Sequence, residues 1–173
     1  MSCALTQGYT LDCRLNYGGV KEVYFIEKGN VISFTLTGNL ITTITKVTAK
    51  LFRKYELIAH TADAEEAMSF SREMGTQNSK QSVKFPINKM ATSVRDEILL
   101  LAQNVLYIVV VDENGKNWLY GKDYGMMLMT ASAKTGKALG DRNGYELSFE
   151  SDEKVLAYEV DAATLTSLTV AGA

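Results

Sequence analysis

The clearest apolar pattern in the chain predicts one α-helix, over about residues 92–104. Apolar residues recur there at steps of three and four, which sets them along one face of a helix; they are Val94, Ile98, Leu101, Ala102 and Val105. Ser93 is placed to accept a hydrogen bond from the amide of Asp96, and acidic residues in the first turn suit the helix dipole. Asn104 tolerates the left-handed conformation and is expected to end the helix.

Most of the remaining pattern predicts short β-strands. Residues 106–111 form an apolar, β-branched run typical of a buried strand, and Asp112-Glu113-Asn114-Gly115 suits the hairpin turn after it. Further strands are expected at 20–27, 31–37, 40–47, 50–58, 83–87, 121–132 and 145–150, with Pro86 at an edge or exit. This pattern predicts a mainly β (α+β) fold, an antiparallel β-sandwich or barrel with one packed helix.

Both ends of the chain and one central stretch lack a core pattern of their own. Residues 1–19 and 151–173 are predicted to be extended N- and C-terminal arms around a core of residues 20–150, with a strand at 9–15 in the first arm. Deletion of either arm is therefore expected to leave the sandwich folded. Residues 59–80 are polar and are predicted to form an exposed loop, although 62–68 also suit a turn or two of helix and 69–73 a short strand.

The composition fits one globular domain with arms. Of the 173 residues, 46% are hydrophobic and 22% charged, which is enough to bury a core. A single proline beside 13 glycines suits long strands, because proline removes a ladder donor. The net charge of −2 argues against a dedicated nucleic-acid binder. The sequence shows neither a transmembrane run nor a signal peptide, so synthesis in a cytoplasm without membrane association is expected.

The sequence offers little that would support catalysis. A catalytic triad or a Cys-His pair would have to use His60, the only histidine, which has no nucleophile motif beside it. Cys3 and Cys13 are not at metal-ligand spacing and are expected to be reduced thiols. Thr135-Gly136-Lys137 lacks the other residues of a phosphate loop, and residues 112–115 lack those of a calcium loop. We therefore predict no enzyme activity, no catalytic residues, no cofactor and no metal.

Two charged clusters are interpreted as surface features rather than sites. They are the acidic group Asp63, Glu65 and Glu66 and the basic group Lys50, Arg53 and Lys54. Solvated charge is the expected state of the acidic group. The basic group has no aromatic platform beside it, so salt bridges at the surface are expected there rather than a nucleic-acid footprint.

Two apolar clusters suit a core or an interface. Three methionines, at 126, 127 and 129, lie in a strand that is apolar on both faces and so needs cover on both, which favours a subunit interface for one face. A surface that binds carbohydrate or peptide would use the one aromatic cluster, for which core packing is the expectation. Its members are Tyr107, Trp118, Tyr120 and Tyr124.

A series of short segments links this chain to a known type of protein. The run 95–104 is followed by a strand, by Asn114-Gly115-Lys116-Asn117-Trp118-Leu119-Tyr120-Gly121, by Gly125 and by the loop 137–145. This series resembles structural proteins of tailed phages, in particular the tail-tube family. The opening Leu5-Thr6-Gln7-Gly8-Tyr9 and Gly18-Gly19-Val20-Lys21-Glu22-Val23 is similar to virion proteins of phages that infect Bacteroidetes.

The resemblance implies a major tail tube protein of a virion, made in the host bacterial cytoplasm. Its copies would assemble as stacked hexameric rings around a channel, contacting one another and other virion proteins, with DNA only passing through the lumen. The family's ring-bridging hairpin or loop would map onto residues 59–80. The alternatives are a capsid decoration protein, a head–tail connector and a tube of a contractile injection system. A monomeric β-sandwich binding module is the remaining alternative.

Overall fold

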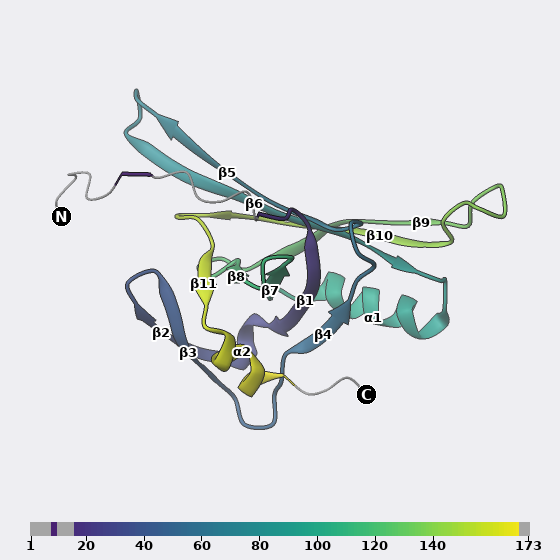
Figure 1. Ribbon diagram of the computed structural model, residues 1–173, viewed down its shortest axis with the longest axis horizontal. Coiled ribbons are helices and arrows are strands. Elements are labelled where there is room, and N and C mark those ends of the chain that lie inside the picture. The colour runs from purple at the N-terminus through teal and green to yellow at the C-terminus, as the bar shows by residue number, and fades with distance from the viewer. Residues whose placement is uncertain (1–7, 10–15, 170–173) are drawn as a thin grey trace.

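The computed structural model describes residues 8–9 and 16–169, and two β-sheets pack face to face in it (Figure 1). One sheet has seven strands in the order β2-β3-β11-β8-β7-β1-β4. These are β1 (Val20–Glu27), β2 (Val31–Thr37), β3 (Leu40–Lys46), β4 (Arg53–Glu56), β7 (Leu106–Asp112), β8 (Asn117–Tyr120) and β11 (Tyr158–Val160). A single 3₁₀ turn, η1 (Lys28–Asn30), joins β1 to β2.

The other sheet has four strands in the order β5-β6-β10-β9, each antiparallel to its neighbour. They are β5 (Asp63–Ser71), β6 (Thr76–Asn88), β9 (Met127–Lys134) and β10 (Gly144–Glu153). The helix α1 (Thr92–Gln103) lies against this sheet next to β9 (Figure 1). The predicted fold class is confirmed: the protein is a mainly β sandwich with one packed helix. In the described residues the sheets stay open rather than closing into a barrel.

The main core fills the space between the two sheets. Phe85 and Phe149, from the four-stranded sheet, stack with ring centroids 5.9 Å apart, and both contact Phe25 of β1. Ile98 and Leu101 of α1 extend this core beneath the helix. Burial of these side chains removes large apolar surfaces from water, which is the main source of the sandwich's stability.

A second core lies on the opposite face of the seven-stranded sheet. Tyr107, Val109 and Leu119 project into it, because successive residues of a strand point to opposite faces. A short helix, α2 (Ala162–Leu168), covers this face with Leu165 and Leu168. The central strands of the seven-stranded sheet are therefore buried on both faces.

The predicted helix is confirmed, but its ends differ from the prediction. Ala91 occupies the N-cap position without a side-chain hydrogen bond, so the predicted cap by Ser93 is wrong. Asn104 is extended, at φ −110°, rather than left-handed, and its side chain instead donates to the Leu100 carbonyl at 2.7 Å. The chain enters β7 almost at once, and an extended residue makes that exit directly. Ala102 is exposed, because the buried face of α1 is narrower than its apolar stripe.

The predicted polar loop at 59–80 is wrong, and so is its helical alternative. Most of this stretch forms a long antiparallel hairpin of β5 and β6, in which Glu65 pairs with Ser82 and Ser71 with Thr76. It looked like a loop because one face of the hairpin is exposed and because the tip extends beyond the rest of the sheet (Figure 1). Polar residues on a solvated face leave only a weak apolar alternation.

The predicted C-terminal arm is also wrong over its described part, residues 151–169. β10 continues to Glu153, and β11 lies inside the seven-stranded sheet between β3 and β8. Asp161 caps α2 by accepting the amides of Ala163 and Thr164. Removal of this segment would open the second core, so it is part of the domain.

The predicted N-terminal arm can be followed only in part. Cys3, Cys13 and residues 10–15 of the predicted strand lie outside the described residues. Tyr17 donates its backbone amide to the Asn114 side chain at 3.0 Å, which ties the chain before β1 to the β7–β8 hairpin.

The other predicted strands are found, several with different lengths; the strand predicted at 83–87 is the last part of β6, Thr76–Asn88. The strand predicted at 50–58 is shorter, β4, and the predicted Met-rich strand starts later, as β9. Pro86 pairs with Glu146 of β10 but lies past the last β5–β6 pair, Asp63 with Lys84. Pro86 therefore lies near the exit of the strand, two residues before β6 ends, as predicted.

Candidate interaction surface

The outer face of the four-stranded sheet is polar from one edge to the other. Residues that pair across strands share a face, so this face carries Glu65, Ser82, Glu150 and Met127 at one level and Lys84, Ser148 and Thr130 at the next. Carboxylates outnumber lysines on it: Asp63, Glu65, Glu146, Glu150 and Asp152 stand against Lys80, Lys84 and Lys134. Lys80 contacts Glu150 at 2.8 Å and Lys134 contacts Glu146 at 3.6 Å.

Both edges of this sheet are long strands without a partner among the described residues. β5 forms one edge and β9 the other, and neither contains proline. Met127 and Met129 are 50% and 60% exposed along the β9 edge, where a bulge interrupts the pairing with β10. Open strand edges of this length readily pair with another chain. The methionines were predicted to lie in a core or an interface. Met126 is buried in the core, whereas Met127 and Met129 are exposed at the edge strand.

The β5–β6 hairpin extends past the sheet as an arm, here called the arm tip (residues 69–78). β6 pairs with β10 only from Asn88 to Ser79, so beyond that point, among the described residues, the two strands pair only with each other. Phe70 is 68% exposed and Met74 is 78% exposed at this end. Figure 1 shows the arm tip projecting away from α1 and β4.

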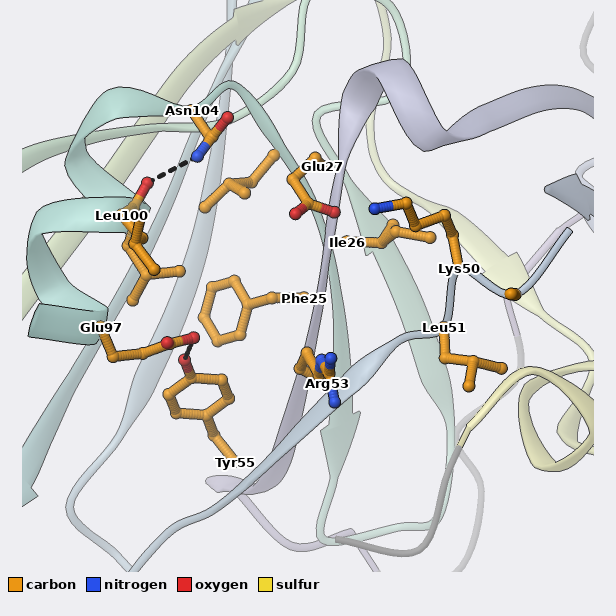
Figure 2. Close-up of a pocket in the computed structure, with 13 residues that line it drawn as sticks. Phe25, Ile26, Glu27, Lys50, Leu51, Arg53, Tyr55, Glu97, Leu100 and Asn104 are labelled. Atoms are coloured by element: carbon orange, nitrogen blue, oxygen red, sulfur yellow. Dashed lines mark hydrogen bonds between the residues drawn. The ribbon is translucent and has the colours of Figure 1, made fainter. Parts of the chain in front are cut away.

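A cavity of about 470 Å³ opens between α1 and the chain that leads into β4 (Figure 2). Its floor is apolar, with Phe25 between the two walls, and Leu51 and Leu100 line opposite sides. Charged groups surround this floor: Lys50 and Arg53 come from the β4 side, Glu97 comes from α1, and Glu27 of β1 lies beside Lys50. The Tyr55 hydroxyl donates to Glu97 at 2.8 Å and fixes that carboxylate. Burial is the largest cause that raises the pKa of Tyr55, and this hydrogen bond raises it further. The Tyr55 hydroxyl therefore stays protonated and remains a hydrogen-bond donor.

A buried carboxylate that the sequence did not reveal organises the loop between β8 and β9. Glu153 is 3% exposed and accepts hydrogen bonds from the amides of Asp123, Tyr124 and Gly125, and from the Ser151 hydroxyl at 2.9 Å. Gly125, at φ +87°, permits this approach, since a Cβ there would lie 2.3 Å from Val105. The protein itself fills the site, so Glu153 is a structural anchor rather than a reactive group.

The residues considered as catalytic candidates have surface or structural positions. His60 is exposed in a turn, with φ +62°. The loop containing Thr135-Gly136-Lys137 is closed by Asp141, which accepts the amides of Lys137 and Ala138; these hydrogen bonds hold the pKa of Asp141 below its usual range. Asp112 likewise accepts the amides of Asn114 and Lys116, which confirms the predicted hairpin there.

The surface roles predicted for the two charged clusters are confirmed only in part. Lys54 contacts Glu22 at 2.9 Å and Glu56 at 3.2 Å, which confirms a salt bridge for that residue. Asp63 and Glu65 are exposed on β5, whereas Glu66 faces inward and accepts the Ala157 amide at 2.6 Å.

The aromatic cluster does not form an exposed platform. Tyr107 and Tyr120 are buried and Trp118 is half-buried, as predicted, while Tyr124 is exposed. The surface that sequence reasoning missed is the pair of open edges, because β5 was taken for a loop.

Two further features bear on the kind of protein this is. No group of three or more His, Cys, Asp or Glu residues within the described chain is arranged to hold a metal ion. Neither α1 nor α2, the two α-helices of residues 16–169, has the length and apolar character needed to cross a membrane. Comparison of the chain with protein-family models, curated proteins and solved structures gives no match.

Proposed function

We propose that this protein is a structural subunit of a phage virion, the major component of a tail tube. Its copies would join head to tail into rings, and the rings would stack around a channel that conducts DNA. The observation that carries this proposal is the four-stranded sheet: both long edges are open, the inner face is covered, and the outer face is polar. A surface of this kind suits repeated edge pairing better than it suits binding of a small ligand.

The directions of the edge strands favour a ring. In a sheet of four antiparallel strands the first and last strands, β5 and β9, run in opposite directions. A copy rotated about an axis therefore brings its β5 antiparallel to β9 of its neighbour. Such a contact joins two different surfaces, so it repeats from copy to copy and closes a ring when the rotation divides the circle.

The alternation of faces restricts the register of this pairing. The core-facing residues of β5 and β9 must lie on the same face of the joined sheet. A slip of one residue would move every side chain to the opposite face. A register with Lys134 opposite Asp63 of the next copy satisfies this and pairs the whole of β9, apart from the bulged Met129, with β5 residues 63–69. Ser132 then lies opposite Glu65, and Leu128 opposite Met68. One pair of opposite charges, Lys134 and Asp63, then meets on the polar face, and the apolar Leu128 and Met68 meet on the core face.

The ring places the polar face toward the channel. The core face of the sheet is occupied by the seven-stranded sheet and α1, so only the outer face is free to line an enclosed space. That face has more carboxylates than lysines. DNA phosphates bind basic surfaces strongly, and a weakly acidic wall lets DNA pass without being held.

Edge substitutions test the proposal. In the register above, Thr130→Asp with Ser132→Asp sets carboxylates beside Glu65 of the next copy, and the substitutions should block rings without unfolding the domain. The matched control is Ser33→Asp with Thr35→Asp on β2, the edge strand of the other sheet, where both residues are exposed. Negative-stain electron microscopy and mass in solution report the result. Wild-type rings with a central hole, kept by the control and lost by the β9 variant, support the proposal.

Two results would contradict it. A wild-type chain that stays monomeric up to concentrations at which tubes are expected would exclude self-assembly. Rings of wild-type mass from the β9 variant would exclude this edge as the interface, whatever the control does.

A further inference from the structure

We infer that the cavity between α1 and β4 is a binding site for a small amphipathic carboxylate, a molecule with an apolar body and one carboxylate group. The apolar body lies against the floor at Phe25, and the carboxylate pairs with Arg53 at the start of β4. Such a site is separate from the proposed ring contact, because no residue of β5 or β9 lines this cavity.

The cavity is large enough to hold a whole small molecule. Its volume of about 470 Å³ lies within the range of about 300–1,000 Å³ that is typical of small-molecule sites. A second hollow beside α1, lined by Leu99 and Ala133 among others, has a volume of about 250 Å³ and falls below that range. Of the two hollows that flank the helix, size therefore favours the one between α1 and β4.

The floor of this cavity is apolar and is held in place by the main core. Phe25 is 2% exposed, and its ring meets the Tyr55 ring edge-on with centroids 4.8 Å apart. Leu51 and Leu100 lie on opposite walls (Figure 2), and Leu100 is 55% exposed. Apolar walls offer water few hydrogen bonds, whereas an apolar ligand that covers them removes their surface from water.

Arg53 is the charged group at this cavity that is left to pair with a ligand. Glu97 already accepts the Tyr55 hydroxyl at 2.8 Å, and Lys50 extends toward Glu27, so these two charges offset each other (Figure 2). Arg53 forms no ion pair with any described residue. A guanidinium binds a carboxylate through two parallel hydrogen bonds, so Arg53 suits an anionic group of this shape.

The floor and Arg53 together define the class of ligand. A purely apolar molecule would cover the floor but leave Arg53 without a partner, and a small inorganic anion would gain nothing from the apolar walls. A second negative charge on the ligand would be repelled by Glu97, which the Tyr55 hydrogen bond holds on the α1 side. One carboxylate on a hydrocarbon chain or ring satisfies each of these conditions.

The first experiment tests the carboxylate, with octanoate as the ligand and 1-octanol as its uncharged counterpart. Isothermal titration calorimetry of the full chain should show saturable binding of octanoate at one site. Arg53→Gln should weaken octanoate binding about tenfold, as expected for the loss of a charge-assisted pair. The same variant should bind 1-octanol as the wild type does, because the hydroxyl carries no charge for Arg53 to meet.

The second experiment tests the location, with two neighbouring leucines of α1 as a matched pair. Leu99 and Leu100 are each 55% exposed, but Leu100 lines the larger cavity and Leu99 the smaller hollow. Leu100→Asp should weaken both ligands about tenfold or more, and Leu99→Asp should leave both affinities unchanged. Arg95→Gln, beside the smaller hollow, is the charge control for Arg53→Gln. Circular dichroism and urea unfolding check that each variant is folded.

Four results would overturn the inference, and none of them bears on whether rings form. They are no saturable binding of octanoate, octanoate binding that Arg53→Gln leaves unchanged, and binding weakened by Leu99→Asp or Arg95→Gln instead, which would place the ligand in the smaller hollow. The fourth is octanoate binding by dispersed protein that is lost on assembly, because another copy would then fill the cavity. A chain that binds octanoate as expected but forms no rings would overturn the proposed function alone.

Discussion

The two sheets of this protein contain similar strands but use their faces differently. In β7 of the seven-stranded sheet, Leu106 to Val110 are all buried, because alternate side chains enter two separate cores. In β10 of the four-stranded sheet, buried Leu147 and Phe149 alternate with Ser148 and Glu150, which face outward. A sheet buried on both faces serves as support, whereas a sheet buried on one face has a free surface to offer.

The two sheets also differ in their edge strands. The seven-stranded sheet ends in the short strand β4 on one side and in β2 on the other, and α2 covers part of its second face. The four-stranded sheet ends in the longer strands β5 and β9, both open. The four-stranded sheet therefore combines two open edges with a free outer face, whereas the seven-stranded sheet has one edge of similar length, β2, and its central strands support the fold.

The largest difference in stability should separate substitutions at two adjacent residues of β10 whose side chains face opposite sides of the sheet. Phe149→Ala should lower the free energy of unfolding by about 4 kcal/mol, because it leaves a cavity beside Phe25 and Phe85. Ser148→Ala should change it by less than about 0.5 kcal/mol, because the Ser148 hydroxyl has no hydrogen-bond partner among the described residues. Urea unfolding followed by tryptophan fluorescence measures both. Equal effects would mean that the two faces are not distinct.

The next effect tests the buried carboxylate at the end of β10. Glu153→Ala should cost about 3 kcal/mol, because it leaves the buried amides of the β8–β9 loop without an acceptor. Glu146→Ala, in the same strand but exposed and 3.6 Å from Lys134, should cost less than about 0.5 kcal/mol. Urea unfolding gives the free energies, and hydrogen exchange should show faster exchange at residues 123–125 only in the first variant.

A smaller effect tests whether the C-terminal helix belongs to the support sheet. Leu165→Ala should lower the free energy of unfolding by about 2 kcal/mol, since Leu165 covers the second core. Leu156→Ala, at an exposed position, is the control and should have little effect. Assembly at concentrations where the variant is folded should be unchanged. An unaltered midpoint in Leu165→Ala would show that α2 is dispensable for folding.

The smallest effect concerns pH and the edge of the support sheet. Burial opposes ionisation of Glu22, but hydrogen bonds from Lys54 and Tyr24 outweigh it and hold the pKa of Glu22 below 4.5. A depressed pKa in the folded state stabilises the protein above pH 4.5, and this stability is lost as the pH falls further. The loss should be under about 1 kcal/mol and absent in Glu22→Gln. Unfolding at pH 6 and pH 3.5 measures the difference, and identical losses in both proteins would contradict the assignment.

The sequence predicted the elements whose apolar pattern is strong. The run at 106–111, the hairpin turn after it and the apolar steps from Val94 to Leu101 indicated β7, the β7–β8 hairpin and α1 in their observed places. The fold class followed from these elements and from the glycine turns between short strands. Such patterns are local, so each is legible in a window of a few residues.

Three features could not be read locally. β5 was hidden because its outward face is polar and its inward face carries Ala64, Glu66 and Met68, a weak alternation for a strand. β11 and α2 were taken for an arm because each is too short to show a core pattern. Glu153 looked like one of many surface carboxylates, since its burial depends on a loop that precedes it by almost thirty residues.

The sequence by itself determined that this chain folds into a β-sandwich with α1 packed on it, because periodic burial is visible in the order of apolar and polar residues. Only the tertiary structure decided which strands lie at the edges, which face of each sheet is free and where the arm ends. Edges and free faces depend on which distant segments pair, and pairing partners leave no local trace in the chain. The surfaces proposed for assembly are of this second kind.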